Sequence, residues 1–195
     1  MSGAAGASAG RFRRGRPAGA EWVSAGRRTG GLGVDGPGSW LQRLQELGLQ
    51  LPPVPAPVAA YVPAVRHGGL IWVSGQLPVV GGQVQYHGHL GAEVTLEEAY
   101  AAARLCALNA LAAASSVAPG GPAGVGAPVS VEGFVQCVPD FRDQAKVING
   151  ASELFGQLFP GGGHRRFAVG CAALPLGSPV EVGVLFSLAA GGGDG

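Results

Sequence analysis

A long alanine-rich stretch in the middle of the chain constrains the fold more than any other feature. Thr95 is followed three residues later by Glu98, the pairing of a capping box, so a helix is expected to begin there and to run to about Ala114. Its small side chains allow close packing against a β-sheet. The same stretch contains Arg104 and Asn109, which makes it a poor candidate for a transmembrane span. The sequence therefore predicts a core helix and no membrane partner.

The remaining segments supply a sheet and a second long helix. A helix is expected to begin near Asp143, because six apolar residues recur at helical spacing: Val147, Ile148, Ala151, Phe155, Leu158 and Phe159. Strands are expected at 61–65, 70–74 and 129–138 and around Arg166 and Glu181, with a short helix after Trp40 and a loop or hairpin over 79–92. This order predicts an α+β sandwich, a mixed sheet with two helices on one face.

The last two predicted strands carry a candidate binding site. Alternation places Arg166, Ala168 and Gly170 on one face, and a guanidinium beside side chains that small leaves room for a ligand. Its planar fork suits a carboxylate. Glu181 begins a second alternating run that ends at Phe186. If the two strands are adjacent, they bring one cation and one carboxylate to the same cavity. The alternative is a surface ion pair across two strands.

Charge is distributed unevenly along the 195 residues. Residues 1–38 carry a net charge of +4, while the rest of the chain carries −3. A mildly acidic domain lacks the electrostatic footprint of a nucleic-acid binder. The Gly- and Ala-rich segment 1–38 is interpreted as a disordered basic extension, and 189–195 as a flexible Gly-rich tail. The extension is an organellar targeting segment, a solvated extension, or the product of an upstream start codon in a GC-rich gene.

The cellular compartment follows from the same features. Three cysteines, with neither metal-type spacing nor an even number, fit a reducing compartment. The location is therefore cytoplasmic, or mitochondrial or plastid if residues 1–38 are a transit peptide. His87 and His89 are either half of a metal site or two solvated imidazoles, and His164 either helps to bind an anion or lies in a polar turn.

Several separated motifs in a fixed order support a family resemblance. They are Val73-Ser74-Gly75-Gln76-Leu77-Pro78, Asp140-Phe141 leading to Asn149, and Arg166 followed by Leu174-Pro175 and Glu181. From about Trp40 to Leu188 the chain resembles the reactive intermediate deaminases (RidA, or YjgF-like). The resemblance implies one domain over 39–188 with a chorismate-mutase-like fold. It also implies a homotrimer with pockets between neighbouring subunits.

The resemblance implies roles for six residues. Arg166 would grip the substrate carboxylate, and Glu181 would orient or activate the attacking water. The substrate-binding positions would be Tyr61, Ser74, Gly75, Asn149 and Arg166, the asparagine being matched only if a short insertion after Phe141 is allowed. Ala168 stands where well-studied family members have a cysteine, so that thiol is absent.

Three functional hypotheses follow. The first is an enamine/imine deaminase that hydrolyses 2-imino acids, derived from 2-aminoacrylate, to keto acids and ammonia with no metal or organic cofactor. The second is a non-catalytic trimer that binds small carboxylates or acts as a scaffold. The absence of the family cysteine at Ala168 supports this second hypothesis. The third is a ribonuclease, against which the acidic domain argues.

Overall fold

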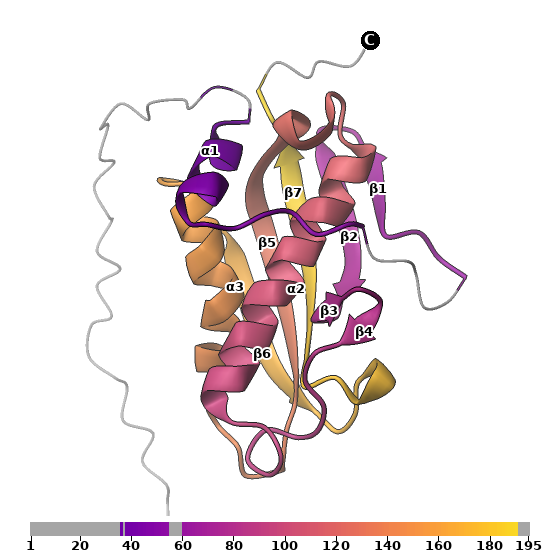
Figure 1. Ribbon diagram of the computed structural model, residues 1–195, viewed down its shortest axis with the longest axis vertical. Coiled ribbons are helices and arrows are strands. Elements are labelled where there is room, and N and C mark those ends of the chain that lie inside the picture. The colour runs from indigo at the N-terminus through magenta and orange to yellow at the C-terminus, as the bar shows by residue number, and fades with distance from the viewer. Residues whose placement is uncertain (1–35, 37, 55–59, 191–195) are drawn as a thin grey trace, which may run out of the picture. The chain divides into compact units, whose positions relative to one another are not determined.

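A five-stranded sheet organises the chain, with its strands in the order β1-β2-β7-β5-β6 (Figure 1). The computed structural model describes residues 36, 38–54 and 60–190, so the predictions for 1–35 and 191–195 lie outside the described residues. The strands are β1 (Ala64–His67), β2 (Leu70–Gln76), β5 (Val125–Gln136), β6 (Arg165–Cys171) and β7 (Val180–Leu188). Only β5 and β6 pair in parallel. This arrangement makes β6 one edge of the sheet and β1 the other.

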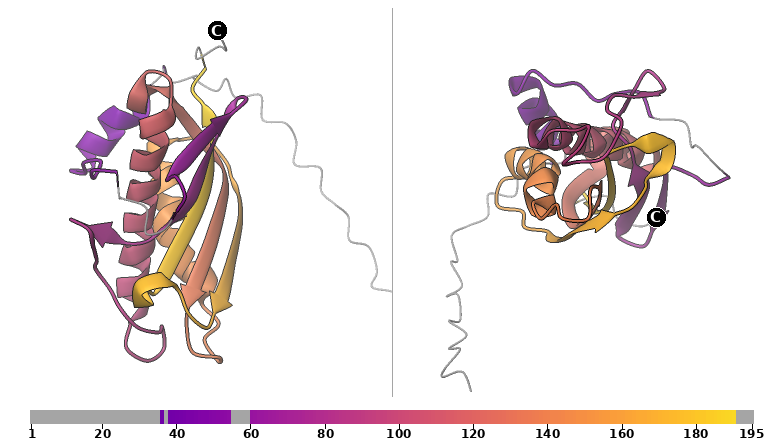
Figure 2. Two further views of the ribbon diagram at one scale, coloured as in Figure 1. Left: turned by 90° about the vertical axis from the view of Figure 1, so that its right-hand side faces the viewer. Right: turned by 90° about the horizontal axis from the view of Figure 1, so that it is seen from below.

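The two long helices cover a single face of this sheet, as Figure 2 shows from the side. They are α2 (Leu96–Val117) and α3 (Gln144–Leu158), and the short α1 (Ser39–Glu46) packs against α3. The Arg43 Nε donates a hydrogen bond to the carbonyl of Leu158 at 2.7 Å, which fixes α1 at the end of α3. Within the described part of the chain no helix lies on the other face, and the α+β prediction with helices on one face is confirmed.

Helix α2 begins where the sequence predicts. The Thr95 hydroxyl accepts a hydrogen bond from the Glu98 amide at 3.2 Å, and the Glu98 carboxylate accepts one from the Thr95 amide at 2.9 Å. Length and composition alone would allow α2 to cross a bilayer, but most of it is buried inside the fold, as in a core helix. The buried Asn109 amide donates to the carbonyls of Leu77 and Val79, at 2.9 and 3.1 Å. These hydrogen bonds join α2 to the segment that follows β2.

The strand boundaries differ from prediction where glycine and proline lie inside strands. β5 begins at Val125, four residues earlier than expected, although Gly126 and Pro128 suggested a loop. The β5–β7 register shifts on both sides of Pro128, and a proline is tolerated at such an irregularity because no ladder hydrogen bond is lost. β1 begins at Ala64 and not at Tyr61. Segment 79–92 contains the small hairpin β3 (Val79–Val80) and β4 (Gln83–Val84).

A glycine contact sets the distance between α2 and α3. A methyl group on Gly150 would overlap the carbonyl oxygen of Tyr100 in α2, so only glycine allows the two backbones to approach this closely. The Tyr100 hydroxyl also donates to the Glu153 carboxylate of α3 at 2.7 Å. Gly156, in the same helix, faces open space.

These two glycines give a matched test of the packing. Gly150→Ala forces the helices apart and is expected to lower the free energy of unfolding by about 1–3 kcal/mol. Gly156→Ala is expected to raise it by about 0.5–1 kcal/mol, because alanine is the better helix former. Urea unfolding followed by circular dichroism measures both. Equal effects of the two substitutions would contradict the close helix contact.

Candidate functional site

Arg166 lies on edge strand β6 and points to the helix-covered face of the sheet. Its register partner is Val131, which is fully buried beneath the helices. Its Nη1 group donates to the Asn149 Oδ1 at 2.8 Å and to the Ser152 Oγ at 3.1 Å. Asn149 and Ser152 lie three residues apart on α3, so they share one side of that helix. The structure therefore brings Arg166 and Asn149 together, as predicted, with Ser152 as a third member.

Glu181 lies on the opposite, uncovered face of the sheet. Its neighbours in β7, Val180 and Val182, are fully buried on the helix side, so alternation turns Glu181 the other way. The carboxylate sits directly over Gly75 of β2, where a methyl group would overlap it. Glycine at 75 therefore leaves room for the carboxylate in this position, and a larger residue there would make the Glu181 side chain shift. The structure brings Glu181 and Gly75 together.

Glu181 has no hydrogen bond or ion pair to any other described residue. Partial burial raises the pKa of its carboxyl group above the ordinary value of 4.5, because desolvation disfavours the charged form. A half-buried carboxyl group without a partner and with a raised pKa is suited to exchanging a proton with a ligand or with water.

The two charged residues do not share a cavity within one chain. β5 lies between β6 and β7, so the predicted adjacency of the two strands is wrong. Arg166 pairs with Val131 of β5 and Glu181 with Phe134, which leaves two strand spacings and three residues between them. Their Cα atoms are therefore roughly 14 Å apart, and their side chains point to opposite faces. Sequence spacing could not reveal that a third strand separates them.

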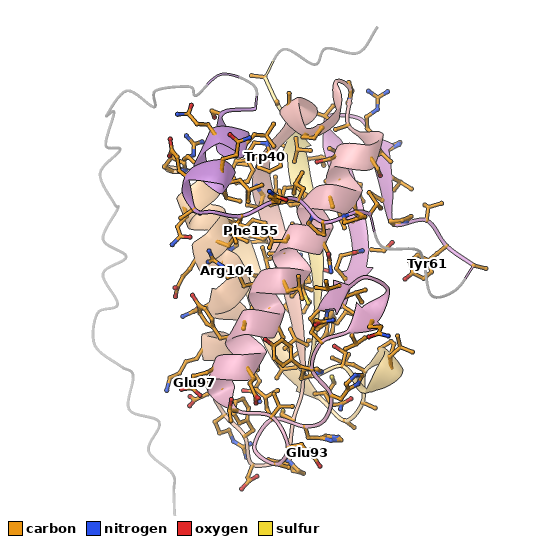
Figure 3. All side chains as sticks on the ribbon, in the orientation of Figure 1. Trp40, Tyr61, Glu93, Glu97, Arg104 and Phe155 are labelled. Atoms are coloured by element: carbon orange, nitrogen blue, oxygen red, sulfur yellow. The ribbon has the colours of Figure 1, made fainter. Side chains whose placement is uncertain are left out.

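Ser74 and Tyr61 lie in the other half of the sheet. The Ser74 hydroxyl donates to the carbonyl of Val62 at 2.8 Å, so it fastens the lead-in segment to β2. Tyr61 is exposed on that lead-in, away from the body of the sheet and helices in Figure 3. Because the lead-in enters β1, at the opposite edge from β6, Tyr61 does not join Arg166 in this chain.

A cavity of about 350 Å³ lies at the carboxyl ends of β5 and β6. Its lining includes Cys137, Phe141, Gln144, Gly170 and Cys171. Gly170 follows Arg166 and Ala168 on the same face of β6, as alternation predicts. All three cysteines lie in apolar segments, which favours buried thiols, but only Cys106 of α2 is buried, whereas Cys137 and Cys171 are half-buried and line this cavity.

The three candidate histidines have structural partners. His87 Nδ1 lies 3.2 Å from the carbonyl of Leu176, and His89 Nε2 lies 3.1 Å from that of Ala172, so both rings tie the 87–89 loop to the β6–β7 connection. His164 Nε2 lies 3.0 Å from the Ser152 Oγ. Among the described residues, no group of three or more His, Cys, Asp or Glu side chains could hold a metal ion.

Sequence reasoning missed Ser152. The only available signal was its position three residues after Asn149 in a predicted helix, which places both on the side that faces β6. A serine in a helix carries no pattern of its own, so its contact with Arg166 required the structure.

Comparison with known proteins shows the family of the chain. Residues 41–188 match the model of the family described as "YjgF/chorismate_mutase-like, putative endoribonuclease". The chain belongs to the YjgF/RidA-like family. Protein TCP17 of Trypanosoma cruzi is 44% identical over 149 residues, which are 74% of this chain and 91% of that protein.

Two solved structures extend the likeness to the fold. A protein of unknown function from Agrobacterium tumefaciens superposes with a TM-score of 0.70 at 39% identity, over 77% of this chain and 92% of that one. A Shewanella oneidensis protein named as a putative endoribonuclease gives a TM-score of 0.72 at 33% identity, over 77% and 99% of the two chains. The chorismate-mutase-like fold predicted from the motifs is confirmed.

The raised pKa of Glu181 has a consequence for stability. The folded protein binds this proton more tightly than the unfolded chain, so stability falls as the pH rises from 4.5 through the higher folded pKa. Glu181→Gln removes the charge and is expected to raise the urea midpoint at pH 7. The gain should shrink towards pH 4, where the wild-type carboxyl group is protonated.

Glu132→Gln provides the control for that experiment. Glu132 lies on the same sheet face, but it pairs with Arg165 at 3.0 Å, so its replacement removes an attractive contact and should give no gain. A Glu181→Gln variant that is less stable than wild type at pH 7 would show that burial of the charged carboxylate does not destabilise the fold.

Proposed function

We propose that the protein is an enamine/imine deaminase whose site is assembled between neighbouring subunits of a homotrimer. Arg166 of one subunit holds the substrate carboxylate, and Glu181 of the next faces the C=N carbon. The observation that carries the proposal is the placement of Arg166 and Glu181 on opposite faces of one sheet, in a family member whose motifs match the deaminases. Two such residues meet only when the β6 edge of one copy approaches the open face of another.

The open sheet face supports an assembly of copies. Its exposed apolar side chains include Trp72, Val65 and Val169, which are 51%, 48% and 43% exposed. They come from β2, β1 and β6, so apolar surface extends from one edge of the sheet to the other. Apolar surface spread over several strands is typical of a protein–protein interface. A homotrimer is the assembly that the family resemblance implies.

The chemistry assigns one task to each charged residue. Arg166 binds the carboxylate of a 2-imino acid by two parallel hydrogen bonds. Glu181 accepts a proton as water attacks the C=N carbon and returns it to the nitrogen, and the resulting carbinolamine releases ammonia and leaves the keto acid. Such proton transfer contributes about 10²–10⁴-fold in rate. These steps require no metal or organic cofactor.

The other predicted residues have supporting roles in this proposal. Gly75 keeps the space that the Glu181 carboxylate occupies, and Ser74 anchors the segment that carries Tyr61. Because Tyr61 is exposed at the far edge of the sheet, it reaches the site only from a neighbouring subunit. Asn149 holds Arg166 through its Oδ1, and its Nδ2 is left to contact the substrate.

A second function is favoured by one observation. Ala168 replaces the cysteine of the well-studied deaminases, so a trimer that binds small carboxylates or acts as a scaffold, without turnover, is the alternative. A ribonuclease is disfavoured, because residues 39–195 carry a net charge of −3, while nucleic-acid binding depends on basic surface. The partners are then a small carboxylate-bearing imine or enamine and the chain itself, with neither nucleic acid nor membrane.

Turnover distinguishes the deaminase from the binding protein. The wild type is expected to accelerate pyruvate release from freshly generated 2-iminopropionate. Arg166→Ala and Arg166→Lys should both lose this activity, since an ammonium group cannot form the two-pronged contact.

Glu181→Gln should lower kcat by about 10²–10⁴-fold with the assembly intact. No acceleration by a well-folded wild type would move the function to the carboxylate-binding alternative, and full activity of Arg166→Ala would refute the site.

Mixed assemblies test whether the site lies between subunits. Arg166→Ala and Glu181→Gln are each expected to be inactive, but co-expressed subunits would pair the intact Glu181 of the first with the intact Arg166 of the second. Random mixing in equal amounts would restore about a quarter of the sites. Recovery after co-expression supports the composite site. Complete absence of recovery in verified mixed trimers would refute the composite site.

A further inference from the structure

The Ser152 hydroxyl joins Arg166 to His164. The Arg166 Nη1 lies 3.1 Å from the Ser152 Oγ, and the His164 Nε2 lies 3.0 Å from the same oxygen. A guanidinium group only donates hydrogen bonds, so the Oγ accepts from Arg166. The hydroxyl hydrogen is then available to His164, whose Nε2 accepts it in the tautomer that carries its proton on Nδ1. In the other tautomer Nε2–H would donate to the second lone pair of the Ser152 Oγ, so the position of the ring proton distinguishes the two arrangements.

The surroundings of His164 favour this neutral form. Burial, and then the charge of Arg166, lower the pKa of His164 below its ordinary value of 6.5. The ring packs edge-on against Phe155 of α3, with ring centroids 6.2 Å apart. The nearby charged groups have other partners, since Glu153 accepts from Tyr100 and Arg165 pairs with Glu132. The surroundings thus favour an uncharged imidazole beside Ser152.

The hydrogens of Arg166 can be counted from these contacts. Nη1 carries two, and both are used, by the Asn149 Oδ1 at 2.8 Å and by the Ser152 Oγ. Nε and Nη2 have no hydrogen-bond partner among the described residues. A carboxylate can pair with a guanidinium across Nη1 and Nη2 or across Nε and Nη2. The pairing across Nη1 and Nη2 is blocked, because Asn149 and Ser152 of α3 already accept both hydrogens of Nη1.

We propose that Ser152 and His164 are positioning residues of the carboxylate site, which hold Nη1 of Arg166 on α3 so that a ligand carboxylate binds across Nε and Nη2. This inference rests on the proposed carboxylate-binding role of Arg166. In the pairing across Nε and Nη2, the carboxylate lies in the plane of the guanidinium group. Fixing the guanidinium plane therefore also fixes the plane of the carboxylate. The orientation of the adjoining C=N group towards Glu181 of the neighbouring subunit is set in the same way.

The test uses pyruvate, the keto acid released from 2-iminopropionate, as an unreactive probe of the full-length protein. Ser152→Ala removes one of the two hydrogen bonds of Nη1 and is expected to weaken pyruvate binding about tenfold. Ser152→Thr keeps the hydroxyl and should bind within about twofold of wild type. His164→Ala should weaken binding in the same direction, and His164→Gln, which keeps an acceptor, should restore it. Calorimetry measures the dissociation constants, and thermal unfolding shows whether each variant is folded.

A nuclear magnetic resonance signature separates positioning from a merely structural role. Pyruvate should shift the Nε–H resonance of Arg166, assigned from its absence in Arg166→Lys, and His164 should show the Nδ1–H tautomer. Unchanged pyruvate affinity in a folded Ser152→Ala variant, or a carboxylate that leaves the Nε–H resonance unperturbed, overturns the inference. If wild type fails to bind pyruvate at all, the proposed function of Arg166 fails first and this inference falls with it. Binding without turnover of 2-iminopropionate would refute the deaminase and leave the positioning intact.

Discussion

The pairing of β5 with two different neighbours is the constraint on which the rest of the structure depends. β5 bonds antiparallel to β7 on one side and parallel to β6 on the other. The parallel connection requires a crossover, which α3 supplies, and the crossover places α3 on the same face as α2. β6 becomes an edge strand as a result. Arg166 is held at that edge against α3, while Glu181 emerges on the uncovered face.

This arrangement explains why Arg166 and Glu181 have few hydrogen-bond or ion-pair partners. Arg166 is held through Nη1, by Asn149 and Ser152, and its Nε and Nη2 have no hydrogen-bond partner among the described residues. Glu181 is half-buried over Gly75 and has no ion-pair partner among the described residues. An unpaired, partly desolvated carboxylate costs stability. An unpaired carboxylate of this kind is what the proposed site between subunits requires.

Much of the fold could be predicted from local patterns. The capping box at Thr95, the apolar stripe of α3 and the alternation through Arg166 all depend on neighbours a few residues away, and all were confirmed. Pro128 was misleading because a strand irregularity tolerates it. The position of β5 between β6 and β7 could not be predicted, since strand order is a long-range property. For the same reason Ser152 was missed, as its role depends on a contact with a strand 14 residues away.

A crystal structure of the protein grown with pyruvate would show whether Arg166 of one subunit and Glu181 of another face the same ligand. The account predicts a three-fold assembly in which the pyruvate carboxylate pairs with Nε and Nη2 of Arg166. The carbonyl carbon should face the Glu181 carboxylate of the adjoining subunit. Pyruvate bound to Arg166 with no Glu181 of any copy near it, or an assembly that leaves the open sheet face uncovered, would contradict the account.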